Sequence, residues 1–529
     1  MRARIARRVV FVTAVALFGL ARPTVSQQES TDNHSPTVTS NERRVPSERA
    51  LMLAARTRAS CSEDVEELLG ELVAFETYHR EGTDNAEQPA FQEMSRWLKN
   101  FADRSGLGFA DHGNVVVVSL AGGPERLGVI AHGDVQPADP KKWAKSPFSL
   151  DTGSEPGRLI GRGTEDDKGP LACALIAMRE LRATGWPLAR TVELIISFTE
   201  ESDWAPFQKF LESNPPPPLN VGFDADYPVV VAEKGWCSVM VSLPAQAEQS
   251  SGSNIVPEAR LSGFTGGFFL SQVPEDAVAR IDHATAEVRS VLKAAVAEDS
   301  EVRFSFEQDG EQLIVRAHGI SAHSSLPEKG RNGITHLARV LGAWDWPDST
   351  QAFMVRFINE RIGVGFYGEL FGDLAYSDEF MGPLTLSLGT LREESGALVA
   401  GINVRRPEGR SSQEVEESLR DAVKSWSESH GMTGLELEMS VSEPHRVHGA
   451  PHVPVLLNTF RHYTGITDAE PLSIGGGTHA SMVPYGVNFG PAMPGELYTG
   501  HSEHEFITRD QLQQNLEMYT SLLVDLSVR

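Results

Sequence analysis

The sequence is poor in cysteine, with 3 among 529 residues. So few cysteines exclude a disulfide framework, even in an exported chain. The chain also contains no long run of lysine and arginine, and its formal net charge is -25. This charge excludes phosphate backbones and anionic lipid surfaces as expected partners, so we predict no nucleic acid ligand.

No apolar run is long enough for a comfortable transmembrane helix. The N-terminal run, residues 9–21, follows an arginine cluster that ends at Arg7 and Arg8, and small residues continue to about Ser26. This order is typical of a signal peptide over residues 1–26. It predicts an exported protein, periplasmic or secreted, with no other membrane association; an uncleaved anchor is the alternative.

The composition is that of a globular chain, with 40% hydrophobic and 22% charged residues, and the length allows more than one domain. Residues 27–58 are rich in Ser, Thr, Asn, Gln and charge, and predict a flexible leader. Helical spacing starts at about residue 61, and a second amphipathic helix is predicted over residues 91–101.

Nearly continuous apolar runs predict buried strands over residues 114–120, 127–131 and 192–198. Between the last two, residues 168–184 predict a helix, because Pro170 stands in its first turn and Gly185 follows its end. The order strand, helix, strand predicts an α/β/α sandwich.

The pattern changes at about residue 243. Strand-like runs such as 302–306 and 312–317 alternate with predicted helices over 275–298 and 413–429. This mixture predicts an α+β domain over residues 243–440 that is inserted into the first domain. The first domain then consists of residues 59–242 and 441–529.

Polar residues gather where the apolar runs end. Residues 161–170 read Gly-Arg-Gly-Thr-Glu-Asp-Asp-Lys-Gly-Pro at the start of a predicted helix, and Asp166 and Asp167 alone would predict a solvated cap. However, the stretch lies between His-Gly-Asp at 132–134 and Glu-Glu at 200–201, which also follow apolar runs. Imidazoles and carboxylates at strand ends indicate a metal site.

The spacing of these residues suggests which of them bind metal and which orient a ligand or transfer a proton. His132 and Asp134 can point to one side of the sheet, so that one binds metal while the other orients it. The adjacent carboxylates of residues 200–201 repel each other unless one binds a metal and the other takes a proton from water. A further pair of candidate ligands, between which spacing does not decide, is Asp224 and Asp226.

Taken together, these motifs resemble those of the zinc-dependent M20 family of exopeptidases, most of all its dipeptidase branch of dipeptidase V and the carnosinase-like enzymes. The resemblance covers the chain from about residue 61 onward. Its motifs are His-Gly-Asp-Val at 132–135, Gly-Arg-Gly at 161–163, Asp-Asp-Lys-Gly-Pro at 166–170, Thr-Glu-Glu-Ser at 199–202, Asp-Ala-Asp-Tyr-Pro at 224–228, Glu-Lys-Gly at 233–235, Ala-His at 322–323, Asn-Val-Arg-Arg-Pro at 403–407 and Gly-Gly-Gly-Thr at 475–478.

The resemblance implies a zinc-exopeptidase α/β/α catalytic domain, an inserted α+β lid domain and a site for two Zn²⁺ ions, for which Mn²⁺ or Co²⁺ can substitute. The resemblance further implies that Asp166 bridges the two metals and that a cis peptide bond joins it to Asp167. The implied metal ligands are His132, Asp166, Glu201, Asp224 and His501. The resemblance also implies Glu200 as general base and Asp134 as the carboxylate that orients His132.

For the substrate, the resemblance implies that His323 helps to hold the scissile carbonyl and that Arg405 receives a carboxylate. The remaining predicted substrate-binding residues are Asn332, Gly476 and Gly477. One departure is His479, which stands where related sequences often have tyrosine and predicts a difference in specificity.

We therefore predict a dizinc exopeptidase, monomeric because of its large insert, that hydrolyses dipeptides or other small peptides. Two metal ions about 3.5 Å apart can share one hydroxide as nucleophile. One alternative keeps the fold but hydrolyses N-acyl amino acids, as an aminoacylase or carboxypeptidase-like enzyme would. A second alternative is a non-catalytic peptide-binding protein, which would be expected to lack a ligand or the base.

Overall fold

The computed structural model describes residues 45–245 and 258–529. The predicted signal peptide, residues 1–26, lies outside these residues, as does the predicted leader up to residue 44. Within the described part of the chain, no helix is both long enough and apolar enough to span a membrane.

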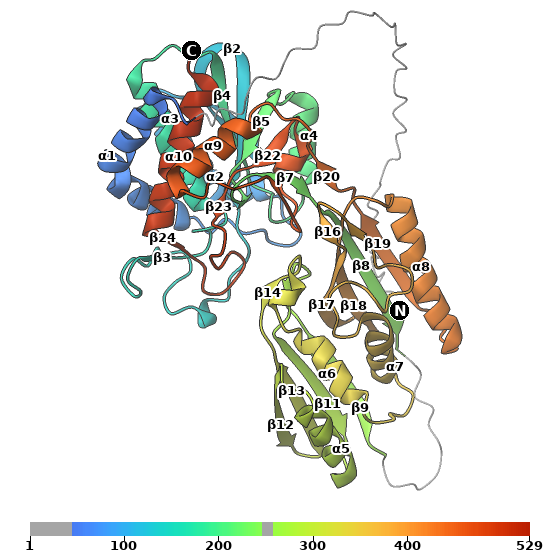
Figure 1. Cartoon of the computed structure of the whole chain (residues 1–529). Coiled ribbons are helices and arrows are strands. Elements are labelled where there is room, and N and C mark those ends of the chain that lie inside the picture. Colours follow the sequence, from blue (N-terminus) through green and yellow to red (C-terminus); the bar gives the residue numbers. More distant parts are fainter. Residues whose placement is uncertain (1–44, 246–257) are drawn as a thin grey trace, which may run out of the picture. The chain divides into compact units, whose positions relative to one another are not determined.

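The first domain is built on a mixed sheet (Figure 1). Both halves of its long strand β2 (Val115–His132) pair with β4 (Arg190–Ser197), which therefore lies between them. These halves correspond to the predicted strands 114–120 and 127–131. The chain reverses between them at Gly122, where a Cβ atom would lie 2.2 Å from the Arg190 carbonyl oxygen, so only glycine fits.

The other strands extend this sheet on both sides. β1 (Gly108–Asp111) pairs with the first half of β2, and β5 (Leu219–Gly222) pairs with the second half. Beyond β5 the order continues through β22 (Gly486–Asn488), β7 (Val230–Glu233) and β20 (His445–Arg446), and β21 (Leu472–Ile474) also pairs with β7.

Helices cover both faces of the sheet, which confirms the predicted α/β/α sandwich. Leu194 and Ile196 of β4 enter the larger apolar core, whereas Ile195 between them enters a smaller core with Phe207 and Phe210 of α4. The helices of this domain are α1 (Glu48–Val73), α2 (Pro89–Ser105), α3 (Lys168–Thr184), α4 (Ala205–Ser213), α9 (Val453–Thr464) and α10 (Arg509–Ser527).

The inserted domain, residues 235–441, has its own antiparallel sheet and its own apolar core. The strands in sheet order are β12 (Arg303–Asp309), β13 (Gln312–His318), β11 (Asp276–Asp282), β9 (Arg260–Gly266), β17 (Thr385–Glu394), β18 (Ala397–Arg406), β8 (Gly235–Pro244) and β19 (Glu436–Val441). Its helices are α5 (Ala286–Ala297), α6 (Gly333–Leu341), α7 (Thr350–Phe357) and α8 (Ser412–Ser429).

Short elements complete the described chain. The remaining two-residue and three-residue strands are β3 (Arg158–Ile160), β6 (Ala225–Asp226), β10 (Gln272–Val273), β14 (Ala322–His323), β15 (Ser377–Asp378), β16 (Gly382–Pro383), β23 (Pro491–Ala492) and β24 (Phe506–Thr508). Single helical turns lie at Asn85–Glu87, Pro140–Lys142, Pro327–Lys329, Ile358–Ile362 and His479–Met482.

Three predictions from the sequence need correction. The leader does not extend to residue 58, because Ser47 caps a helix that starts at Glu48 and buries Leu53. Residues 235–242 belong to the inserted domain, because β8 pairs with β18 and β19. Residues 275–298 are not one helix: Ala277, Ala279 and Ile281 are buried at alternate positions of strand β11, and α5 follows.

Candidate metal centre

The loop between β3 and α3, residues 161–167, is held by one buried carboxylate. Glu505 accepts hydrogen bonds from Arg162 Nη1 (2.8 Å) and from the backbone N–H groups of Gly163, Glu165 and Asp166 (3.0, 3.0 and 3.1 Å). Glu505 directly precedes β24, and β24 pairs with β3, the strand before the loop. This strand pairing holds Glu505 next to the loop. Helix α3 starts at Lys168, as predicted.

The two aspartates of this loop have different surroundings. The peptide bond between Asp166 and Asp167 is cis, which confirms the prediction. Asp167 is fully buried, and its Oδ2 accepts a hydrogen bond from the backbone N–H of His132 at 3.0 Å. This contact ties the start of α3 to the end of β2 and gives Asp167 a structural function.

Asp166 lies between two imidazoles. Its Oδ1 is 2.9 Å from His132 Nε2, and its Oδ2 is 3.2 Å from His501 Nε2. The hydroxyl of Tyr498 also donates to Oδ2, at 2.6 Å. Each carboxylate oxygen of Asp166 therefore faces a different histidine, which is the arrangement that a bridging ligand requires.

The remaining predicted ligands, Asp224 and Glu201, lie close to His132 and His501, respectively. Asp224 Oδ1 is 3.6 Å from His132 Nε2, and Glu201 Oε2 is 2.9 Å from His501 Nε2. Asp226, which spacing alone did not separate from Asp224, lies in β6 and is exposed. The structure thus brings all of the predicted ligands together, from the ends of β2, β4 and β5 and from the loops before α3 and β24.

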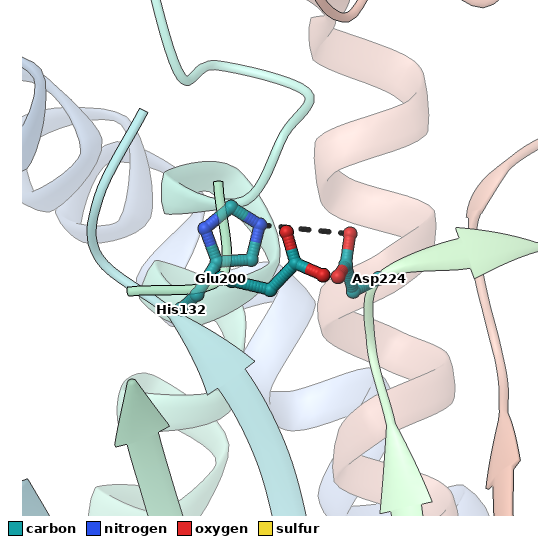
Figure 2. Close-up of side chains that lie close together, drawn as sticks. All are labelled: His132, Glu200 and Asp224. Atoms are coloured by element: carbon teal, nitrogen blue, oxygen red, sulfur yellow. Dashed lines mark ion pairs between the residues drawn. The ribbon is translucent and has the colours of Figure 1, made fainter. Parts of the chain in front are cut away.

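Glu200 belongs to the same cluster (Figure 2). Ligand atoms of His132, Glu200 and Asp224 lie within 4.8 Å of one another, as do those of His132, Asp166 and Glu201. Glu200 therefore stands beside the ligands, where a base or a further ligand would stand.

Asp134 supports the glutamates. Its carboxylate accepts hydrogen bonds from the backbone N–H groups of Glu200 (3.1 Å) and Glu201 (2.9 Å). The ring of His132, which Asp134 was predicted to orient, makes its 2.9 Å hydrogen bond to the Asp134 main-chain oxygen, while the carboxylate lies 3.6 Å away. The Trp204 indole also donates to the Glu200 carbonyl oxygen, at 2.7 Å.

The electrostatics of the cluster fit a divalent cation. Burial raises the pKa of Glu200 well above its usual range and that of Asp224 to about 7. Burial disfavours charge on His501 too, but Glu201 and Asp166 raise its pKa to about 10. Carboxylates outnumber imidazoles in this buried space, and carboxylate oxygen with imidazole nitrogen is a donor set that suits Zn²⁺, Mn²⁺ or Co²⁺.

His323 reaches the centre from the inserted domain. It ends β14, and its ring centroid is 5.4 Å from that of His501. Its Nδ1 is 2.6 Å from the hydroxyl oxygen of Ser325. Burial lowers the pKa of His323 well below its usual value, and the neighbouring charges of His501 and Arg405 lower it further, so the ring is neutral.

Arg405 is a buried cation on β18, with 6% of its surface exposed. Its Nε donates to Asn403 Oδ1 at 3.0 Å, and no carboxylate of the described residues lies within ion-pair distance of it. Burial lowers its pKa to about 10, which still leaves the guanidinium charged at neutral pH. A buried charge of this kind is suited to an anionic group of a substrate.

The other predicted substrate residues lie in two loops. Asn332 caps helix α6: its Oδ1 accepts from the backbone N–H groups of Ile334 and Thr335, and its Nδ2 donates to the Leu388 carbonyl oxygen. These contacts leave one amide hydrogen for a ligand. Gly476 and Gly477 follow β21, in a loop that Thr478 ties to the buried carboxylate of Glu233.

His479 lies beside the metal ligands and lines a small cavity together with His132, Glu200 and Asp224. It is 1% exposed, stacks on Phe207 with ring centroids 4.0 Å apart, and packs edge-on against Trp204. Its ring contacts are therefore with the aromatic side chains of Trp204 and Phe207.

Some contacts of this centre were not predicted. Asp166 is contacted by Glu505 at its backbone N–H and by Tyr498 at its carboxylate. The Glu200 carbonyl oxygen accepts from Trp204, and Glu201 Oε2 accepts from Gln136 Nε2 at 2.9 Å. Glu505 and Tyr498 lie more than three hundred positions from Asp166 in the chain, so no local pattern connects them.

Comparisons with known proteins agree with this geometry. The model of peptidase family M20/M25/M40 matches residues 128–525. The "Putative dipeptidase YtjP" of Bacillus subtilis is 32% identical over 424 residues, which is 79% of this chain and 86% of that protein. The Beta-Ala-Xaa dipeptidase of Lactobacillus delbrueckii subsp. lactis is 28% identical over 437 residues, 82% of this chain and 89% of that protein.

Solved structures share the fold at low sequence identity. Human carnosine dipeptidase 1 aligns with a TM-score of 0.57 and 15% identity, over 91% of this chain and 99% of that chain. The di-peptidase Dug1p of Saccharomyces cerevisiae aligns with a TM-score of 0.53 and 11% identity, over 89% of this chain and 98% of that chain. These similarities confirm the predicted fold class.

Proposed function

Because the chain belongs to peptidase family M20/M25/M40, we propose that it is a dipeptidase that works with two divalent metal ions. The observation that supports two ions is the position of Asp166, whose two oxygens each face a different histidine. His132, Asp166 and Asp224 would hold one ion. Asp166, Glu201 and His501 would hold the other.

When bound, the ions, Zn²⁺ with Mn²⁺ or Co²⁺ as substitutes, would supply Lewis acidity and would lower the pKa of the attacking water. Glu200 acts as general base: it takes a proton from that water and passes it to the leaving amine. Its backbone is anchored by Asp134 and Trp204, which limits the movement of its carboxylate.

Two residues of the inserted domain act on the substrate. Neutral His323 donates a hydrogen bond to the scissile carbonyl oxygen, where negative charge develops. Arg405 binds the C-terminal carboxylate through parallel hydrogen bonds from its guanidinium. Glu200 as base, His323 as hydrogen-bond donor to the carbonyl oxygen and Arg405 as binding group for the carboxylate would together select a short substrate with a free C-terminus.

We propose dipeptides as the substrates, in line with the names of the relatives, and small peptides or N-acyl amino acids as the alternative. A panel that contains dipeptides, their amides and N-acetyl amino acids separates these classes. Faster hydrolysis of N-acetyl amino acids than of any dipeptide would replace the proposal by the aminoacylase alternative. We further propose that the protein is exported and monomeric.

The decisive experiment compares Glu200→Gln with Glu201→Gln, since each removes one charge from the same pair of carboxylates. Glu200→Gln should keep two bound metal ions by elemental analysis while kcat falls by about 10²–10⁴-fold. Glu201→Gln should lose metal instead. Full activity of Glu200→Gln with both metals bound would show that Glu200 is not the base.

A further inference from the structure

His323 has two hydrogen-bond partners at one ring nitrogen. The Ser325 hydroxyl lies 2.6 Å from Nδ1, and the backbone N–H of Ser325 lies 3.3 Å from the same atom. A backbone N–H can only donate, so Nδ1 accepts. In a neutral imidazole the other nitrogen then carries the proton, which leaves Nε2–H as the only donor of the ring.

The turn that carries these groups is fixed at several points. His323 pairs with Gln272 between β14 and β10, the Ser324 N–H donates to the Ser271 carbonyl oxygen at 2.9 Å, and the Leu326 N–H donates to the His323 carbonyl oxygen at 3.0 Å. The backbone around His323 is thus held independently of the Ser325 hydroxyl, which is free to act on the ring alone.

Ser325 is also confined by the first domain. It is 5% exposed, and a Cβ atom added at Gly475 would lie 2.9 Å from Ser325 Cβ and from its carbonyl oxygen. So close an approach leaves the hydroxyl little room to turn away from His323. Gly475 precedes the predicted substrate loop, so the serine lies where the inserted domain touches that loop.

We propose that Ser325 is a positioning residue that sets both the tautomer and the ring orientation of His323. The Oγ–H donates to Nδ1, and the Nε2–H is thereby presented to the carbonyl oxygen of the scissile bond. This inference rests on the proposed function for the contact between His323 and the substrate. The proposal concerns the hydrogen bond behind the ring, which can be tested separately.

A double-mutant cycle with a neighbouring control tests the effect on rate. Ser325→Ala should lower kcat about tenfold with KM changed by less than about twofold. Ser324→Ala is the matched control: its hydroxyl makes no hydrogen bond within the described residues, so its rate should stay at the wild-type level. In a His323→Gln background, Ser325→Ala should cost little more, because it acts through the ring.

Nuclear magnetic resonance of ¹⁵N-histidine-labelled protein tests the hydrogen bond itself. The signals lost in His323→Gln identify the ring, and Ser325→Ala should shift its Nδ1 resonance while Ser324→Ala should not. An unshifted Nδ1 resonance, wild-type kcat in Ser325→Ala, or equal losses in both backgrounds would overturn the inference. Failure of the proposed function is distinct, since His323→Gln would then keep full activity.

Discussion

At the scale of single residues, Asp166 connects the parts of the centre. Its oxygens contact His132 and His501, and its backbone N–H donates to Glu505. The side chain and the backbone of one residue therefore join the end of β2 to the loop before β24. Few substitutions at this position would keep all three contacts.

Arg405 allows a direct test of substrate recognition. Arg405→Ala should reduce kcat/KM for free dipeptides by roughly 10²-fold or more, because a charge-assisted pair is lost in a buried place. Dipeptide amides, which lack the carboxylate, should lose much less. The measurement is kcat/KM for each substrate pair, with metal content as control, and equal losses on both would contradict the assigned contact.

From the residue pattern alone, side chains of the centre could be predicted only where they follow recognisable strands, and the roles of His501, His323 and Arg405 came from the resemblance to the M20 family. His132 and Glu201 come directly after apolar runs, so their gathering at one sheet edge was predictable. Glu505 and Ser325 were not, since each acts on a partner whose position depends on the folded chain: Glu505 on the backbone of residues 163–166, Ser325 on a ring nitrogen. Sequence identifies charged ligands at strand ends, but not the hydrogen bonds that hold them.

At the scale of elements, the first turns of α1 are part of the folded domain and contact the C-terminal helix and the last residue. The Ser47 N–H donates to the Asp525 carboxylate, Arg49 to the Arg529 carbonyl oxygen and Arg58 to Glu517. A chain that starts at residue 45 keeps all three contacts and is the reference for stability. One that starts at residue 59 should lose roughly 3–5 kcal/mol, because Leu53 and its buried neighbours are removed.

Thermal and denaturant unfolding of both shortened chains measure this difference. Equal stability of the two would mean that residues 48–58 contribute nothing to the fold, as the predicted leader would have required. Wild-type chain and the chain from residue 45 serve as the pair of controls.

His452, which precedes α9, should make stability depend on acidity. It is buried and bonds to the Asn220 carbonyl oxygen, and burial lowers its pKa from 6.5 to about 4. The unfolded chain therefore takes up this proton first, so the stabilising contribution is complete above pH 6.5 and is lost as the pH falls toward 4. The shift corresponds to about 3 kcal/mol.

The variant His452→Gln keeps a donor at this place but does not titrate. Its free energy of unfolding should lie below that of the wild type at pH 7, and the difference should shrink by up to about 3 kcal/mol at pH 4. Measuring both proteins at each pH cancels the effects of the other groups. A difference that stays constant with pH would rule out the lowered pKa.

Element prediction succeeded where one signal was strong and failed where two competed. Continuous apolar runs and Gly185 gave β4 and α3 at the right places. In residues 275–298, a short stretch in which apolar and polar residues alternate is followed by a stretch with helical spacing. Together the two stretches resemble one long helix. Likewise, β8 follows β7 after Lys234 with little change in composition, so the sequence predicts the domain boundary several residues too late.

For the whole molecule, removal of metal should lower stability. Asp166, Glu200, Glu201 and Asp224 are gathered in one partly buried cluster, and without cations their repulsion is relieved only by proton uptake. Treatment with a chelator should lower the unfolding temperature by about 5 °C or more, and Zn²⁺, Mn²⁺ or Co²⁺ should restore it.

Calorimetry before and after chelation is the measurement, and Glu201→Gln should respond less because it binds less metal. An unfolding temperature that does not change when both metals are removed would show that the cluster is stable without them.

The order of the chain has a consequence for its synthesis. The inserted domain occupies residues 235–441 without interruption, whereas the first domain needs β20, β21, β22 and α10, which follow the insert. On the ribosome, therefore, the insert can complete its sheet while the first domain still lacks strands and its last helix. The two-ion centre that we propose is therefore completed last, since His132, Asp166 and Asp224 precede the insert and His501 follows it.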